Sequence, residues 1–204
     1  MKHINRCSPP SDFVIFVKSK PKAWSDLSVN NHTLYETCRE MLAKDQNDKS
    51  GYTELPLTKK PNAWHIDHFL KRMHFPNEMF DWQNFIADNH TKGYGADYKD
   101  CNVTKEENQR LINPITEQPE TFFTYMINGE IVPQDTLSTF DKSRAELTIE
   151  KFNLNHPDLV KTRQNVADLI AVYKDVQLNE EEIIAALDSD YGLDTFVRFV
   201  LASS

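Results

Sequence analysis

The sequence predicts an α+β protein with a mixed N-terminal module and a helical C-terminal lobe, and three patterns indicate this class. Residues 34–43 repeat apolar side chains at helical spacing. The pair Asn128-Gly129 lies between two apolar, β-prone runs, which is a strong hairpin signal. After Asp141 the apolar positions return to helical spacing. We therefore expect residues 1–140 to form the module that carries the chemistry and residues 141–204 to form the helical lobe.

In the first half of the chain, proline and glycine limit the regular elements. Pro56 and Pro61 forbid a long helix, so short extended pieces are expected through the fifties and sixties. Residues 80–89 are compatible with a strand, a loop or a helix, and a loop is expected at Gly93 and Gly95. The helix expected over residues 34–43 turns one apolar face inward. This face is made of Leu34, Cys38, Met41 and Leu42.

The second half contains sharper signals for turns and helix ends. The hairpin is expected to turn at Asn128-Gly129 through a type I′ turn, because both residues tolerate positive φ. Asp158 is expected to cap a helix, and Asn179 with Glu182 to form a capping box at the start of the next. Asp194 is expected to open a last short helix. Side chains expected to face inward are Ala145, Ile149, Phe152, Leu159, Val166, Ile170, Tyr173, Ile183, Ile184 and Leu187.

Composition indicates a soluble globular protein. Hydrophobic residues make up 39% of the chain and charged residues 26%, which fits a folded protein rather than a disordered one. No apolar run approaches the roughly 20 residues that a membrane helix needs, and the start of the chain lacks the features of a signal peptide. We therefore expect a cytoplasmic protein. Three scattered cysteines, Cys7, Cys38 and Cys101, make a disulfide framework unexpected.

Charge is distributed unevenly along the chain. The net charge of −8 argues against wrapping of nucleic acid by the whole surface. Seven acids and no Lys or Arg occur between residues 175 and 194, whereas basic residues surround Asp67 in the sequence, namely Lys59, Lys60, Lys71 and Arg72. A basic site in an acidic protein suits an anionic substrate and a separate protein partner, and the alternative is that these are ordinary solvated faces.

The segment WHIDHF, residues 64–69, contains the residue types that phosphodiester cleavage with one metal requires. A histidine such as His68 serves as a general base near neutral pH, and a carboxylate such as Asp67 suits a hard divalent cation. Asn84 offers an amide that orients the base, and Asp97 and Asp100 offer further metal ligands. In a regular strand Asp67 and His68 would point to opposite faces, so this assignment requires the strand to end or bend there.

Other interpretations of the same residues stay open. A single histidine is often a hydrogen-bonded structural residue, and Asn84 also suits a turn or a helix cap. His65, His68 and His74 together are a possible zinc site, although their spacing matches no familiar zinc pattern. Sequence motifs for nucleotide hydrolysis and for serine esterases do not occur.

The motif region resembles a known family. The resemblance rests on HIDHF followed by KR, FP, FDWQN and YGADYKD, and on PKAWSDL, LINPITEQPETFFTYMINGEIVP and the segment 145–155. These features are similar to the HNH endonucleases of the PtuB type, found in Septu and retron-associated antiphage defence systems. The resemblance implies a ββα-metal nuclease core, with the hairpin and the helical lobe added to it.

The resemblance also implies roles for individual residues. Asp67 would bind the metal, His68 would be the general base and Asn84 the central Asn. The last element would span residues 94–100, in which Asp97, Lys99 and Asp100 are all candidates for the final motif position. Asp97 ranks first among them as a metal ligand, and Lys99 is a candidate catalytic residue. Substrate-binding residues would be Lys71 and Arg72.

The cofactor and the partners follow from the resemblance as well. The metal would be Mg²⁺ or Mn²⁺. Many relatives carry cysteine pairs for a structural zinc, but Ser50 and Thr53 stand at the first pair and the second pair is absent, so a structural zinc is not expected; packing by Tyr52, Trp64 and Trp82 would replace it. The partners would be a PtuA-type ATPase, a DNA or tRNA substrate and, in retron systems, a reverse transcriptase with its RNA–DNA hybrid. The acidic segment 175–194 and the apolar tail around Phe199 are the expected docking surface. The competing hypothesis is a catalytically silent subunit that only binds a partner or nucleic acid.

Overall fold

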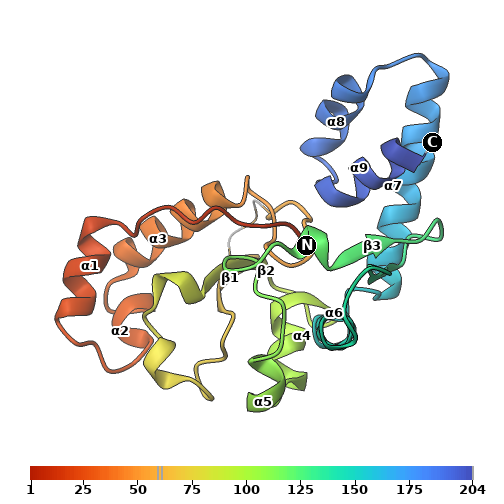
Figure 1. The fold of residues 1–204 in the computed structure, drawn as a ribbon. Coiled ribbons are helices and arrows are strands. Elements are labelled where there is room, and N and C mark those ends of the chain that lie inside the picture. Colours follow the sequence, from red (N-terminus) through yellow and green to blue (C-terminus); the bar gives the residue numbers. More distant parts are fainter. Residues whose placement is uncertain (59, 61, 204) are drawn as a thin grey trace.

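The computed structural model describes residues 1–58, 60 and 62–203, and Figure 1 shows helices arranged around two small antiparallel sheets. The expected α+β class is therefore confirmed. Lys59 and Pro61, which entered the sequence arguments above, lie outside the described residues. The helices and single-turn elements of the N-terminal part are α1 (Ser11–Lys18), α2 (Ser25–Ser28), α3 (His32–Asp45), η1 (Pro76–Glu78), η2 (Trp82–Asn84), α4 (Gly95–Asn102), α5 (Lys105–Asn108) and η3 (Pro119–Thr121).

A two-stranded hairpin lies at the centre of the molecule. Strands β1 (Trp64–His68) and β2 (Phe85–Asn89) pair antiparallel, from Trp64 opposite Asn89 to His68 opposite Phe85. Because side chains alternate along a strand, the hairpin has two different faces. Ile66 and Phe85 lie on the face that packs against α1 and α3 in one hydrophobic cluster, whereas Ile86 belongs to a second cluster with Ala96 of α4 on the other face.

The second cluster joins distant parts of the chain under the hairpin. It contains Met1 and Ile4 from the N-terminal segment, Tyr52 from the loop after α3, and Phe152, which directly follows α6 (Thr139–Lys151). The ring of Tyr52 lies 4.2 Å from the ring of Phe152, measured between centroids. The helix expected over residues 34–43 is confirmed as the middle of α3, with Cys38 and Leu42 fully buried.

The predicted hairpin is confirmed, but the predicted turn type is wrong. Strands β3 (Phe123–Tyr125) and β4 (Ile131–Pro133) pair antiparallel around the Asn-Gly pair. Gly129 has a φ of +85°, whereas Asn128 is not among the residues with positive φ. The Gly129 amide donates to the carbonyl of Met126, which places Asn128 inside a four-residue turn. Only the glycine therefore needs the left-handed conformation, as in a longer hairpin loop with a bulge.

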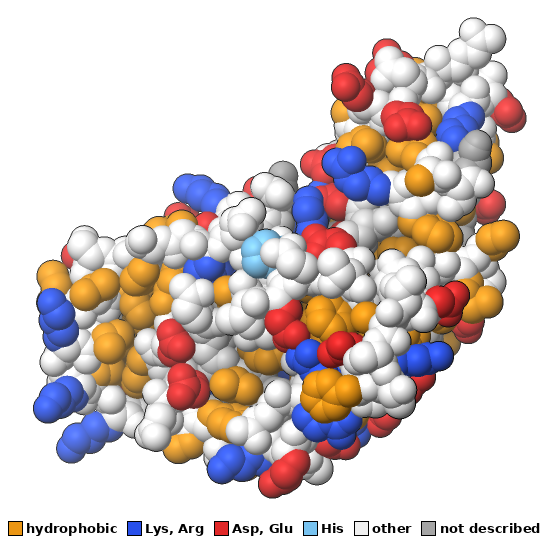
Figure 2. Space-filling view, in the orientation of Figure 1, with side chains coloured by type: hydrophobic (Ala, Val, Ile, Leu, Met, Phe, Trp, Pro, Cys, Tyr) orange, Lys and Arg blue, Asp and Glu red, His pale blue; other side chains and the backbone are white. Residues whose placement is uncertain are grey.

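Within residues 141–204, the helices α7 (Pro157–Asp175), α8 (Glu180–Asp188) and α9 (Asp194–Ser203) surround a third hydrophobic cluster and form the lobe. Ala145 of α6 lies instead in the second cluster. The capping box of α8 is confirmed, since Asn179 and Glu182 bond to each other's backbone amides. Asp158 is not the cap of α7, because His156 caps that helix, Pro157 is its first residue and Asp158 lies in its first turn. Figure 2 shows the lobe projecting from the rest of the molecule, with acidic side chains on its surface.

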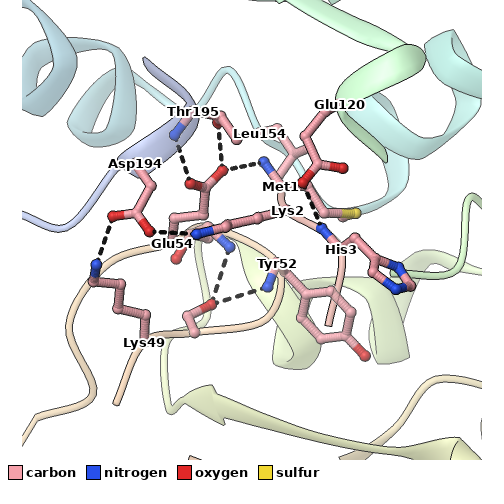
Figure 3. A network of polar contacts seen from close by, with 12 residues as sticks. Met1, Lys2, His3, Lys49, Tyr52, Glu54, Glu120, Leu154, Asp194 and Thr195 are labelled. Atoms are coloured by element: carbon pink, nitrogen blue, oxygen red, sulfur yellow. Dashed lines mark hydrogen bonds and ion pairs between the residues drawn. The ribbon is translucent and has the colours of Figure 1, made fainter. Parts of the chain in front are cut away.

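A polar network fixes the lobe to the N-terminal part, and Figure 3 shows it at close range. The carboxylate of Glu54 accepts from the Met1 amino group at 2.6 Å and from the backbone and hydroxyl of Thr195 at 2.9 and 2.5 Å. Lys49 donates to Asp194 at 2.5 Å and also pairs with Asp188. Two acids of the acidic segment are therefore already neutralised by a buried lysine.

Glycine makes this junction possible. Gly192 has a φ of +60°, and a Cβ there would lie 2.2 Å from the Glu54 carbonyl oxygen. A larger residue would push the start of α9 away from Glu54.

Among the described residues, none of the helices combines the length and apolarity needed to cross a membrane. All three cysteines are free, as expected.

Candidate active site

Asp67 lies at the floor of the site as one half of a buried ion pair. Its Oδ2 accepts from Lys99 Nζ at 2.7 Å and from the Tyr52 hydroxyl at 2.5 Å, and the residue is only 3% exposed. Lys99, fully buried in α4, also donates to the carbonyl of His68 at 2.7 Å. Burial by itself would raise the pKa of Asp67, but the Lys99 ammonium and its hydrogen bond hold that pKa below its ordinary value. Asp67 is therefore a charged carboxylate whose Oδ2 has two donors.

His68, the last residue of β1, points to the opposite face of the hairpin. Its Nε2 lies 2.9 Å from the carbonyl of Met79, and its ring meets Trp24 edge-on with centroids 4.5 Å apart. A carbonyl only accepts, so Nε2 carries the proton and Nδ1 is the nitrogen that can accept one. Burial lowers the pKa of His68 to about 4, against the opposing effect of Asp67. The imidazole is therefore neutral at neutral pH, as a general base must be.

Asn84 fixes the loop that follows β1. Its Oδ1 accepts from the Leu70 amide at 2.7 Å, and its Nδ2 donates to the carbonyls of Leu70 and Glu78 at 3.1 and 3.0 Å. Among the described contacts it does not touch His68. It bonds to the carbonyl of Glu78, which precedes Met79 in the chain, and the Met79 carbonyl accepts from the imidazole of His68.

A cavity of about 680 Å³ opens beside these residues. Lys71 and Arg72 line it, the first with its Nζ 2.5 Å from the Asp100 carbonyl and the second stacked 5.4 Å from the Trp24 ring. Lys71 is half-buried and Arg72 exposed. The cavity is lined by Lys22, Ala23, Trp24, His65, Ile66, Asp67, His68, Lys71, Arg72, Met73, Met79, His90, Asp97 and Asp100. The structure thus brings Asp67, His68, Lys71, Arg72 and Asp97 to one cavity.

Asp97 belongs to a second cluster on the wall of the same cavity. Its Oδ2 lies 3.2 Å from His90 Nδ1, and its Oδ1 lies 3.9 Å from His65 Nε2. The rings of His65 and His90 stack with centroids 4.0 Å apart. His74, which the zinc interpretation grouped with His65 and His68, is not among the cavity-lining residues. Sequence reasoning missed His90, although the strand register contains the signal.

That signal is the continuation of the hairpin beyond β2. The His90 amide donates to the Ala63 carbonyl at 2.8 Å, and His65 pairs with Asp88. Residues 65 and 90 are therefore diagonal neighbours on one face of the hairpin. Their proximity depends on the strand register, which no local sequence pattern predicts.

The two carboxylates that the family resemblance assigns to magnesium have different partners in the structure. Asp67 Oδ2 already accepts two hydrogen bonds and faces the ammonium of Lys99, which occupies the place of a cation. Asp97 faces two imidazoles instead. Ser50 stands where the family resemblance implies the first cysteine of a zinc-binding pair. It donates a short hydrogen bond to Asp88 and accepts one from the amide of Thr53 at 3.0 Å. Hydrogen bonds therefore hold the turn at Ser50 and Thr53.

The arrangement is suited to general-base chemistry on an anionic substrate, because a neutral histidine and two basic side chains share one cavity. No protein-family model matches the chain. Compared with curated proteins, the chain is 21% identical over 197 residues to the Septu protein PtuB of Bacillus thuringiensis, covering 88% of this chain and 68% of that protein. This likeness supports a distant relationship to Septu proteins.

Proposed function

We propose that the protein is a phosphodiester-cleaving nuclease of a Septu-type antiphage defence system, with His68 as its general base. The observation that carries the proposal is a neutral imidazole fixed by the Met79 carbonyl beside a cavity flanked by Lys71 and Arg72. The distant likeness to a Septu protein supports the defence context. The substrate class, DNA or a structured RNA such as tRNA, belongs to the proposal as well.

In the proposed reaction, His68 Nδ1 takes a proton from a water molecule that attacks phosphorus. The new P–O bond forms as the bond to the leaving oxygen breaks, and that oxygen is protonated from solvent. Lys71 and Arg72 bind the non-bridging phosphate oxygens and offset their charge. Tyr52, Lys99 and Asn84 do not meet the substrate and keep Asp67 and the loop after β1 in place.

The test is cleavage of DNA and RNA by the full chain and by His68→Ala. A general base contributes about 10²–10⁴-fold to a rate, so the variant should lose that factor while its thermal unfolding stays cooperative. His32→Ala, at an exposed histidine of α3 that does not line the cavity, is the matched control and should cleave normally. Cleavage by His68→Ala at the wild-type rate would remove His68 from the mechanism. Requirement for Mg²⁺ or Mn²⁺ stays a prediction of the resemblance, tested by chelation and re-addition.

A second function is favoured by one specific observation, the buried pair of Lys99 with Asp67. An ammonium at the position of a cation is what a catalytically silent binding subunit would tolerate. The two functions differ in one measurement. A silent subunit still binds its partner or nucleic acid but shows no His68-dependent cleavage, even when the whole defence system is present.

The partner in this proposal is a PtuA-type ATPase, and in a retron context a reverse transcriptase with its RNA–DNA hybrid joins it. The docking surface is the exposed acidic face of the lobe, because Asp175, Glu180, Glu181, Glu182 and Asp190 are all exposed. The apolar side chains of α9 fill the lobe's own core, so deleting this region would unfold it.

A charge test is therefore sharper than a truncation. The triple variant Glu180→Gln, Glu181→Gln and Asp190→Asn should lose ATPase binding in a pull-down. Neutralising three exposed acids elsewhere, Asp12, Glu40 and Glu146, should not. Equal binding by both variants would refute this docking surface.

A further inference from the structure

We propose that His65, His90 and Asp97 form a binding site for a divalent transition-metal ion such as Zn²⁺, separate from the Asp67–Lys99 pair. One ligand atom from each of the three side chains lies within 4.8 Å of the other two. Two imidazoles and one carboxylate are a ligand set that zinc enzymes use, with metal bonds of about 2.0–2.2 Å. Ligands on one such ion lie roughly 3–4 Å apart, so small side-chain rotations close the site.

The three ligands come from separate elements that are held in a fixed relation. His65 is in β1, His90 directly follows β2, and Asp97 is in the first turn of α4. Asp88 lies opposite His65 in the strand register. Its carboxylate accepts a hydrogen bond from the amide of Ala96 at 2.7 Å. This bond fixes the start of α4 next to the hairpin and therefore places Asp97 against the two rings.

Gly95 makes this close approach possible. Its φ is +70°, and a Cβ there would lie 2.5 Å from the Asp88 carboxylate. A side chain at this position would displace the Asp88 carboxylate or the start of α4, and its positive φ would be strained. The position of Asp97 is thus set by the contact of the Asp88 carboxylate with the backbone of Gly95 and Ala96, as a preorganised metal site requires.

The chemistry of the cluster points to a metal and away from a simple ion pair. One ion pair needs one histidine, yet two imidazoles stack at an interplanar angle of 12° beside a single carboxylate. Among the described ion pairs, Asp97 has only these two partners. His65 Nδ1 is buried without a hydrogen bond in the described part of the chain. Imidazole donors favour zinc, cobalt and nickel over magnesium.

The site is also accessible. All three side chains line the 680 Å³ cavity, and His90 and Asp97 are 49% and 33% exposed. Three protein ligands leave a fourth position of a tetrahedral ion open to the cavity. This assignment of a binding site does not rest on the proposed cleavage reaction, and its test measures binding alone.

The experiment titrates the full chain with Co²⁺, followed by the visible absorption of the bound ion, and with Zn²⁺ by calorimetry. Both use a Cys7→Ser, Cys101→Ser background, because these two thiols are exposed. His90→Gln, at an exposed position, and Asp97→Asn, at a half-buried one, should each weaken binding at least about tenfold, a loss that even an outer-shell partner of a ligand causes. His65→Ala should do the same.

Two variants serve as controls, and they define the outcomes that overturn the proposal. His74→Ala, outside the cavity lining, and Asp100→Asn, in the lining but outside the cluster, should bind as the parent does. Equal weakening by these controls, absence of Co²⁺ binding, or displacement of Co²⁺ by Mg²⁺ at a similar concentration would each refute a nitrogen-rich site at His65, His90 and Asp97. Binding that survives His90→Gln and Asp97→Asn would also refute it.

Discussion

Replacing Lys99 with methionine tests whether the buried ion pair under the cavity holds the fold together. The variant keeps the length of the side chain but removes the ammonium that lies 2.7 Å from both Asp67 Oδ2 and the His68 carbonyl. Asp67 would keep one donor, the Tyr52 hydroxyl, in a site where it is 3% exposed. Breaking a buried pair in this way costs about 3–5 kcal/mol, a large part of the roughly 5–15 kcal/mol that stabilises most domains.

A double-mutant cycle separates the pair from other effects of the substitution. Asp67→Asn leaves the Lys99 ammonium buried without its counter-charge, so it should also lose several kcal/mol. The double variant has no unpaired charge, and we expect it to be more stable than the sum of the single losses by about 2 kcal/mol or more. Urea unfolding followed by tryptophan fluorescence measures each free energy. Single losses that simply add would refute the coupling.

The pH dependence gives an independent check of the same reasoning. In the wild type the pKa of Asp67 is held down, so its contribution to stability is present above the unfolded value of about 4 and is lost as pH falls below it. In Lys99→Met, burial without the cation raises that pKa, and the folded state gains from protonation. The deficit of the variant should therefore shrink as the pH is lowered from 7 toward 4. A deficit that grows on acidification would contradict this assignment.

Two further predictions concern the cover of the cavity and the attachment of the lobe. Burial lowers the pKa of His68 to about 4, and Trp24→Ala uncovers its imidazole. An NMR titration of this variant should therefore find a pKa closer to 6.5. An unchanged pKa would mean that other groups bury the ring. Lys49→Met leaves Asp194 without its 2.5 Å partner and should lower the free energy of opening of the lobe by about 1–2 kcal/mol, measured by hydrogen exchange of α7–α9, with exchange in α3 as the internal control.

Local signals in the sequence predicted the helices of the lobe and the second hairpin. The capping box at Asn179 works in the structure as its residue types suggest, because its bonds are made within one turn. The two errors were of the same local kind. His156 accepts the amide of Asp158 and Pro157 begins α7, so the cap lies before the acid, and only Gly129 of the Asn-Gly pair adopts positive φ.

The candidate site was only partly predictable, for a physical reason. Asp67 and His68 are adjacent in a motif, but the partner of Asp67 is a lysine of α4 that becomes its neighbour only when the helix packs on the hairpin. Likewise, the strand register brings His90 next to His65. The hydrogen bond from the Ala96 amide to Asp88 brings Asp97 next to both histidines. Long-range packing decides these contacts, and no spacing along the chain encodes them.

The loop between α3 and β1 touches the lobe and the cavity floor at once. Lys49 and Glu54 hold the start of α9 (Figure 3). Tyr52, between them in the chain, donates to Asp67. A displacement of the lobe by a bound partner would be transmitted to the Tyr52 hydroxyl through the backbone between Lys49 and Glu54. The lobe and the floor of the cavity are thus both held by residues of one short loop.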